Sequence, residues 1–128
     1  MGEVSAVAFD LPWPPSVNRY YRHVGPRVLI SRAGRKYRMM AVSRLGGLFR
    51  RLDGDLRLTA EFYPPDRRRR DLDNLLKCTQ DSLQAAGLFS DDSQIKSLRL
   101  DMREPLPPEG LVHVLIESLS TGCRQRCL

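Results

Sequence analysis

A short segment near the middle of the chain holds residue types that phosphate chemistry requires. Residues 66–77 read Asp-Arg-Arg-Arg-Arg-Asp-Leu-Asp-Asn-Leu-Leu-Lys, so four arginines run directly into Asp71 and Asp73, and Asn74 and Lys77 follow. Arginine side chains bind phosphate oxygens, whereas paired carboxylates repel phosphate unless a divalent cation lies between them. The segment therefore predicts a metal-assisted reaction on a phosphodiester backbone.

Each of these side chains also has an ordinary structural explanation. Asp71 or Asp73 can cap a helix, where the helix dipole favours acidic residues. Asp73 and Lys77 can form an exposed ion pair worth less than about 1 kcal/mol, and the arginines at 67–70 can be a solvated loop or a localisation signal. Capping requires one aspartate, however, not two beside four arginines, so the combination favours chemistry.

The charge balance of the chain agrees with an anionic partner. The 128 residues carry 21 Lys and Arg against 15 Asp and Glu, which gives a formal net charge of +6, and the isoelectric point is about 9.7. Such a value is typical of nucleic-acid-binding domains, but many basic proteins bind no DNA, so the clustering at 67–70 carries more weight. The length indicates one domain, which we place at residues 1–119, with 120–128 as a flexible tail.

Several other classes of protein are disfavoured. No apolar run approaches the length of a membrane span, and the N-terminus lacks the basic and apolar regions of a signal peptide. Cys78, Cys123 and Cys127 form no disulfide framework and are interpreted as reduced thiols of a cytoplasmic protein. Because no long apolar run is found, we expect no membrane association, and because no phosphate-cradling glycine loop is found, we expect no nucleotide cofactor. No residue set suggests a Ser-His-Asp arrangement.

Hydrophobic periodicity predicts the elements that position the acidic segment. Alternation predicts strands at about 4–11, 56–62, 95–103 and 111–119, and helical spacing predicts helices at about 32–50 and 72–86, with an irregular hairpin or long loop at 16–30. The order β-α-β-α-β-β describes an α/β (α+β mixed) fold with a small mixed sheet of about four strands and two main helices. The second helix implies a parallel crossover, and the last two strands are expected to form an antiparallel hairpin.

The acidic pair lies at a strand-loop-helix junction. Two residues apart on a regular helix, Asp71 and Asp73 would point about 200° away from each other, but a first carboxylate in the non-helical cap lets both converge. The junction follows the carboxyl end of a strand, where α/β folds bind ligands. Asp92 comes after the same helix, and we expect tertiary folding to bring it back to this corner.

Two long motifs resemble the RusA family of Holliday-junction resolvases. One is the segment 65–77; the other reads Leu-Pro-Trp-Pro-Pro-Ser at 11–16, with Asn-Arg-Tyr-Tyr-Arg at 18–22. The acid pair at 91–92 also stands at the family's spacing, just beyond an Ala-Gly helix end. The resemblance covers residues 7 to about 103, and it departs from the family at Val17, where a second Asn is often found, and at 46–47, where two glycines interrupt the first helix.

The resemblance implies a homodimeric, magnesium-dependent endonuclease that cuts four-way DNA junctions symmetrically in recombination and repair. It assigns Asp71, Asp73 and Asp92 as the metal ligands, for one or two Mg²⁺ ions per subunit with Mn²⁺ as a substitute, and Lys77 as the catalytic lysine. Carboxylate-held magnesium neutralises phosphodiester charge and lowers the pKa of a bound water. The residues expected to contact DNA are Arg67, Arg68, Arg69, Arg70, Asn74, Arg19, Tyr20, Tyr21 and Arg22.

The size of the chain bears on its assembly. A domain of this length has a radius of gyration of about 14 Å, so one copy reaches one scissile phosphate, and paired incisions require a two-fold dimer. The family also implies a cytoplasmic setting in a bacterium or prophage. Two alternatives remain open from the residues alone: a non-catalytic basic module that binds branched DNA, and a magnesium-dependent RNase or phosphatase. Tyr20 and Tyr21 are equally compatible with base stacking and with core packing.

Overall fold

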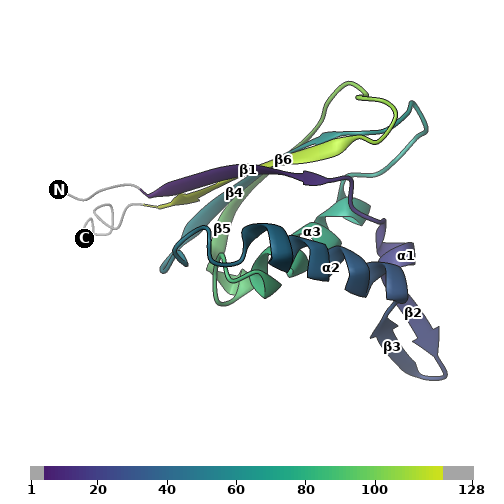
Figure 1. Cartoon of the computed structure of the whole chain (residues 1–128), viewed down its shortest axis with the longest axis horizontal. Coiled ribbons are helices and arrows are strands. Elements are labelled where there is room, and N and C mark those ends of the chain that lie inside the picture. Colours follow the sequence, from purple (N-terminus) through teal and green to yellow (C-terminus); the bar gives the residue numbers. More distant parts are fainter. Residues whose placement is uncertain (1–4, 120–128) are drawn as a thin grey trace.

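One mixed sheet carries the fold, and both long helices cover the same face of it (Figure 1). The computed structural model describes residues 5–119, so the tail predicted at 120–128, with Cys123 and Cys127, lies outside the described residues. The sheet has four strands in the order β1-β6-β4-β5, namely β1 (Ala6–Pro12), β4 (Leu56–Tyr63), β5 (Ile95–Met102) and β6 (Leu111–Ser118). The helices are α2 (Arg32–Leu45) and α3 (Asp73–Ala85). The predicted fold class is confirmed.

Alternating apolar residues determine which face of the central strands is buried. In β4 every second side chain, from Leu56 to Phe62, is fully buried, as are Val112, Val114 and Ile116 in β6. Because successive side chains of a strand point to opposite faces, these residues form one apolar layer beneath the helices.

The parallel crossover is confirmed, but the predicted terminal hairpin is wrong. β4 pairs with β5 in parallel through α3, whereas β6 pairs antiparallel with both β4 and β1. After β5 the chain crosses the end of β4, where the Arg103 amide donates to the Phe62 carbonyl and the Leu106 amide to the Pro64 carbonyl. β6 therefore lies between β1 and β4, and β5 pairs only with β4 among the strands of residues 5–119, at an edge of the sheet.

A small hairpin projects beyond the ends of the helices (Figure 1). It consists of β2 (Tyr21–Val24) and β3 (Arg27–Ile30), preceded by the single-turn helix α1 (Val17–Tyr20), which confirms the hairpin expected at 16–30. Ser31 caps α2 by accepting a hydrogen bond from the Gly34 amide at 3.0 Å. The helix ends at Leu45, earlier than predicted, where the glycine pair begins.

The two helices cover different parts of the sheet. α2 lies towards β1, because the Tyr37 hydroxyl donates to the Pro12 carbonyl at 2.6 Å, and α3 returns the chain from β4 to β5. Tyr20, Tyr37 and Cys78 form a second buried cluster that joins α1, α2 and α3. Burial raises the pKa of the Cys78 thiol to about 12, so this cysteine stays neutral near pH 7. No helix within residues 5–119 has the length and apolar character to cross a membrane.

Candidate active site

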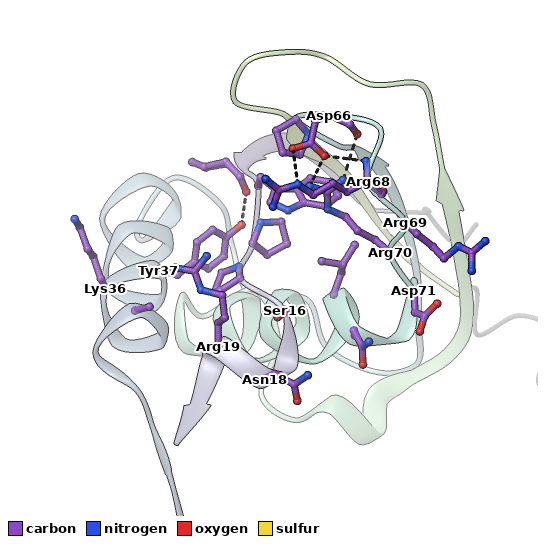
Figure 2. A pocket seen from close by; sticks show the side chains of 18 of the residues that line it. Ser16, Asn18, Arg19, Lys36, Tyr37, Asp66, Arg68, Arg69, Arg70 and Asp71 are labelled. Atoms are coloured by element: carbon purple, nitrogen blue, oxygen red, sulfur yellow. Dashed lines mark hydrogen bonds and ion pairs between the residues drawn. The ribbon is translucent and has the colours of Figure 1, made fainter. Parts of the chain in front are cut away.

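The two sequence motifs, far apart along the chain, line one pocket (Figure 2). Its volume is about 870 Å³, and its walls come from residues 12–19, from the first half of α2, and from residues 65–75. Trp13 anchors the first motif by packing edge-on against Phe62, with ring centroids 6.0 Å apart. The core therefore fixes one wall of the pocket, and the arginine loop forms another.

The pocket is predominantly cationic. Arg19 and Lys36 lie on one side, and Arg68, Arg69 and Arg70 lie on the other (Figure 2), against only two acidic lining residues. A concave surface lined by one sign of charge concentrates counter-charged ligands. This pocket is suited to hold phosphate groups of a nucleic-acid backbone.

Arg70 organises the arginine loop. Its guanidinium pairs with the Asp66 carboxylate at 2.8 Å, donates to the Asp66 and Arg68 carbonyls at 3.2 Å each, and lies 5.4 Å from the centre of the Trp13 ring. The Arg70 side chain is 18% exposed and that of Arg68 is 83% exposed. Arg70 thus shapes the loop, while its neighbours face solvent.

Asp66 holds the start of the same loop. The Arg68 amide, followed by the Arg70 side chain, lowers the pKa of the Asp66 carboxyl. A carboxyl whose folded pKa is depressed stabilises the fold above its unfolded pKa and loses that contribution as the pH falls through the folded value. Asp66 therefore supports the loop throughout the neutral range.

The acidic pair has no structural partner in the described part of the chain. Residue 72, not either aspartate, occupies the N-cap of α3, and no side chain caps that end. The Asp71 backbone carbonyl accepts from the Asn74 amide at 3.2 Å. Within residues 5–119, however, neither the Asp71 nor the Asp73 carboxylate forms a hydrogen bond or ion pair, and Lys77 forms no ion pair with Asp73. Both carboxylates are exposed, and Asp71 lies at the rim of the pocket beside Arg69 (Figure 2). The helix-capping and ion-pair explanations therefore do not apply.

The fold does not bring Asp92 back to this corner within one chain. Asp92 opens the short helix η1 (Asp92–Gln94) just before β5, at the end of the sheet where β4 begins, because Ile95 is the neighbour of Leu56. The Asp71–Asp73 corner follows the other end of β4. Accordingly, no group of three His, Cys, Asp or Glu side chains within residues 5–119 is placed to hold a metal ion.

The two acidic residues at 91–92 have different surroundings. Asp91 caps η1, where its carboxylate accepts from the Ser93 amide at 3.0 Å and Gln94 completes a capping box. These bonds lower the pKa of the Asp91 carboxyl. Asp92 is exposed and takes no part in this cap, so it is the member of the pair that remains available for a ligand.

The residues at 20–22, which were expected to contact DNA, also differ in exposure. Tyr20 is fully buried, and its hydroxyl donates to Asp81, so the expectation that Tyr20 contacts DNA is not met. The half-buried Tyr21 packs edge-on against Tyr20, with ring centroids 4.9 Å apart, and Arg22 is exposed on β2. Arg19 and Asn74, which were also expected to contact DNA, line the pocket.

Sequence reasoning did not assign Lys36 to the site. Lys36 lies on the polar face of α2 and joins the cationic wall of the pocket (Figure 2). The signal available in the sequence was the number of basic residues within the predicted helix, but which of them faces the arginine loop depends on how α2 packs against β1.

Comparison with known proteins agrees with this geometry. A family model described as "Endodeoxyribonuclease RusA" matches residues 12–114. The "Crossover junction endodeoxyribonuclease rusA" of Enterobacteria phage 82 is 40% identical over 111 residues, covering 85% of this chain and 92% of the relative. The RusA proteins of Shigella sonnei and Escherichia coli K12 are 37% and 36% identical over 118 residues, covering 91% of this chain and 98% of each relative. The family match therefore includes both walls of the pocket.

Proposed function

Because the chain belongs to the RusA family of endodeoxyribonucleases, we propose that it is a crossover junction endodeoxyribonuclease, which resolves Holliday junctions by metal-dependent cleavage of DNA. The observation that carries this proposal is the meeting of both motifs around one cationic pocket whose rim bears Asp71, a carboxylate without a structural partner among residues 5–119. A phosphate-binding surface gains nothing from such a carboxylate unless a cation accompanies it.

The residues of the pocket divide the work of binding and cleavage. Arg19, Lys36, Arg68 and Arg69 would hold phosphates on either side of the scissile bond, which fixes the strand without reading its sequence. Arg67 extends this surface along the loop. Lys77 is four residues beyond Asp73 and on the same helix face, where its ammonium would stabilise negative charge that develops on the phosphate.

The donor chemistry at the corner suits a hard divalent cation. Asp71 and Asp73 offer carboxylate oxygens, the ligands that Mg²⁺ selects, and Mn²⁺ accepts the same set. One or two ions per subunit are compatible with three carboxylates. The described chain alone supplies only two of them at this corner, Asp71 and Asp73.

The wider setting follows from the same proposal. Residues 1–119 form the nuclease domain, four-way or branched DNA is the substrate, and the protein works as a homodimer in the cytoplasm of a bacterial cell, since its relatives are encoded by bacteria and a phage. No nucleotide cofactor or membrane takes part. A non-catalytic DNA-binding module does not explain the exposed carboxylates, and an RNase or phosphatase does not agree with membership of the RusA family.

A cleavage assay on a synthetic four-way junction tests the proposal. Wild-type protein in Mg²⁺ should produce paired nicks in opposing strands, and EDTA should abolish them. Asp73→Asn should lose at least about a hundredfold of the cleavage rate while it retains junction binding, because it removes a carboxylate and no phosphate contact. Firm binding by wild type without any cutting would favour the non-catalytic module, and undiminished cutting by Asp73→Asn would remove that residue from the site.

A further inference from the structure

The loop that joins β5 to β6 stands beside the cationic pocket. Figure 1 shows this loop, residues 103–110, at the same end of the sheet as the arginine loop. The Leu106 amide donates to the Pro64 carbonyl at 2.8 Å, and Pro65 and Asp66, the next two residues along the chain, line the pocket. The β5–β6 loop therefore borders the surface that is proposed to hold DNA phosphates.

The backbone of the β5–β6 loop is held in place. Gly110 has a φ of +68°, and a Cβ atom added there would lie 2.7 Å from both the Tyr63 carbonyl oxygen and the Pro65 nitrogen, so the close approach to β4 requires glycine. Three of the four residues at 105–108 are prolines, and each proline fixes its own φ at about −65°. The loop therefore presents its side chains in a restricted set of orientations.

Leu106 is the apolar side chain that this loop presents. It is 43% exposed and is not among the side chains that pack on either hydrophobic core cluster. Single exposed leucines are common on protein surfaces, but this one lies between prolines at the edge of a phosphate-binding pocket. Apolar side chains in such positions can enter between base pairs and unstack them.

The charge of the β5–β6 loop is opposite to that of the pocket. Glu104 and Glu109 are both exposed, and neither carboxylate forms an ion pair within residues 5–119. Repulsion between exposed charges acts over about 8 Å at physiological salt. A duplex that continued straight past the pocket would bring its phosphates within this range of the two carboxylates.

We propose that the β5–β6 loop makes the site selective for branched DNA. Leu106 enters the opening at the branch point, while Glu104 and Glu109 repel the phosphates of a duplex that continues past the pocket. This inference rests on the proposed function, which supplies the branched substrate. Bases at a branch point are less completely stacked than those of a continuous duplex, so inserting a side chain costs less there.

Removing the two carboxylates tests the repulsion. The double variant Glu104→Gln and Glu109→Gln should lower the dissociation constant for a continuous duplex by about fivefold, as expected for two exposed like-charge contacts. It should change the dissociation constant for a four-way junction by less than about twofold. Fluorescence anisotropy in EDTA measures both constants without cleavage.

A matched charge change at the other end of the sheet is the control. Asp53 and Asp55 are exposed just before β4, so Asp53→Asn with Asp55→Asn removes the same net charge far from the pocket. This control should leave the ratio of the duplex and junction dissociation constants unchanged. A double glutamate variant with the same ratio as the control would overturn the proposed repulsion.

A fluorescent base at the branch point tests Leu106. The emission of 2-aminopurine rises when the base unstacks, so wild-type protein in EDTA should brighten a junction labelled there. Leu106→Ser should lose most of this rise and, in Mg²⁺, slow cleavage by about tenfold, because the scissile strand is less well positioned. Leu106→Met should retain both, since methionine supplies a similar apolar volume. Leu48→Ser is the control, because Leu48 is 69% exposed beyond the end of α2.

The outcomes separate this proposal from the proposed function. A full rise in emission with Leu106→Ser, in a wild-type protein that cuts the junction, would refute the insertion of Leu106 and leave the nuclease activity standing. A wild-type protein that brightened the labelled junction but cut no DNA in Mg²⁺ would instead refute the proposed function.

Discussion

At the scale of single residues, Arg70 has a different task from the three arginines before it. Its guanidinium is held by Asp66 and by two backbone carbonyls, whereas Arg67 is exposed and has no ion pair within the described residues. We expect Arg70→Gln to lower the free energy of unfolding by about 1–2 kcal/mol, because hydrogen bonds from a charged donor are lost. Arg67→Gln should leave it unchanged.

Urea unfolding of both variants, followed by junction binding, checks this difference. Both substitutions should weaken junction binding, Arg67→Gln through a lost phosphate contact and Arg70→Gln through a displaced loop. Equal free energies of unfolding for the two variants would show that the contacts between Arg70 and Asp66 do not hold the loop.

The sequence revealed the kind of residue at this site better than its orientation. Four identical arginines contain no information about which one turns inward, and the answer depends on Trp13, which is more than fifty residues away along the chain. Tyr20 shows the same limit, because its hydrogen bond to Asp81 spans 61 residues. Contacts of this kind follow from tertiary packing and leave no local pattern.

At the scale of elements, the approach of α1 to α2 depends on a glycine. A Cβ atom added at Gly34 would lie 2.6 Å from the Tyr20 carbonyl oxygen and 2.8 Å from a side-chain carbon of Ile30. In an open helix, Gly→Ala stabilises by about 0.5–1 kcal/mol, but here the backbone must move. We expect Gly34→Ala to destabilise the protein by about 1–3 kcal/mol and to weaken junction binding, because Arg19 moves with α1.

Ser43→Ala supplies the comparison for Gly34→Ala. Ser43 is exposed on the same helix, so its substitution should change the free energy of unfolding by less than about 0.5 kcal/mol. Thermal unfolding of both variants measures the difference. A more stable Gly34→Ala protein would contradict the close approach of the two helices.

Element boundaries and strand order were not equally accessible from the sequence. Periodicity located all four strands of the main sheet and both long helices, and the capping serine marked the start of α2. It did not show that β6 inserts between β1 and β4, because alternation records which face of a strand is buried and not which strands lie beside it. Only this order shows that β5, on which Leu98 and Met102 are exposed, lies at an edge of the sheet.

At the scale of the whole molecule, the placement of Asp92 follows from topology. A parallel crossover must return the chain along the full length of a strand before the next strand begins, so groups before and after α3 face opposite ends of the sheet. The sequence predicted this crossover and also predicted that Asp92 returns to the acidic corner, and one subunit cannot satisfy both.

The distribution of charge over the molecule gives a final prediction. Replacing the exposed Arg67, Arg68 and Arg69 with Gln should flatten the dependence of log affinity on log salt concentration by about 0.9 for each arginine that contacts a phosphate. Replacing the exposed Arg44, in the last turn of α2, and Arg50 and Arg51, which follow that helix, removes the same net charge away from the pocket. This second set should lower the affinity and flatten the slope much less than the first, because charges far from the DNA are largely screened at the salt concentrations of the assay. Fluorescence anisotropy with a labelled four-way junction at several salt concentrations distinguishes local phosphate contacts from net charge, and equal slopes for both variants would show that the arginine loop does not touch the DNA backbone.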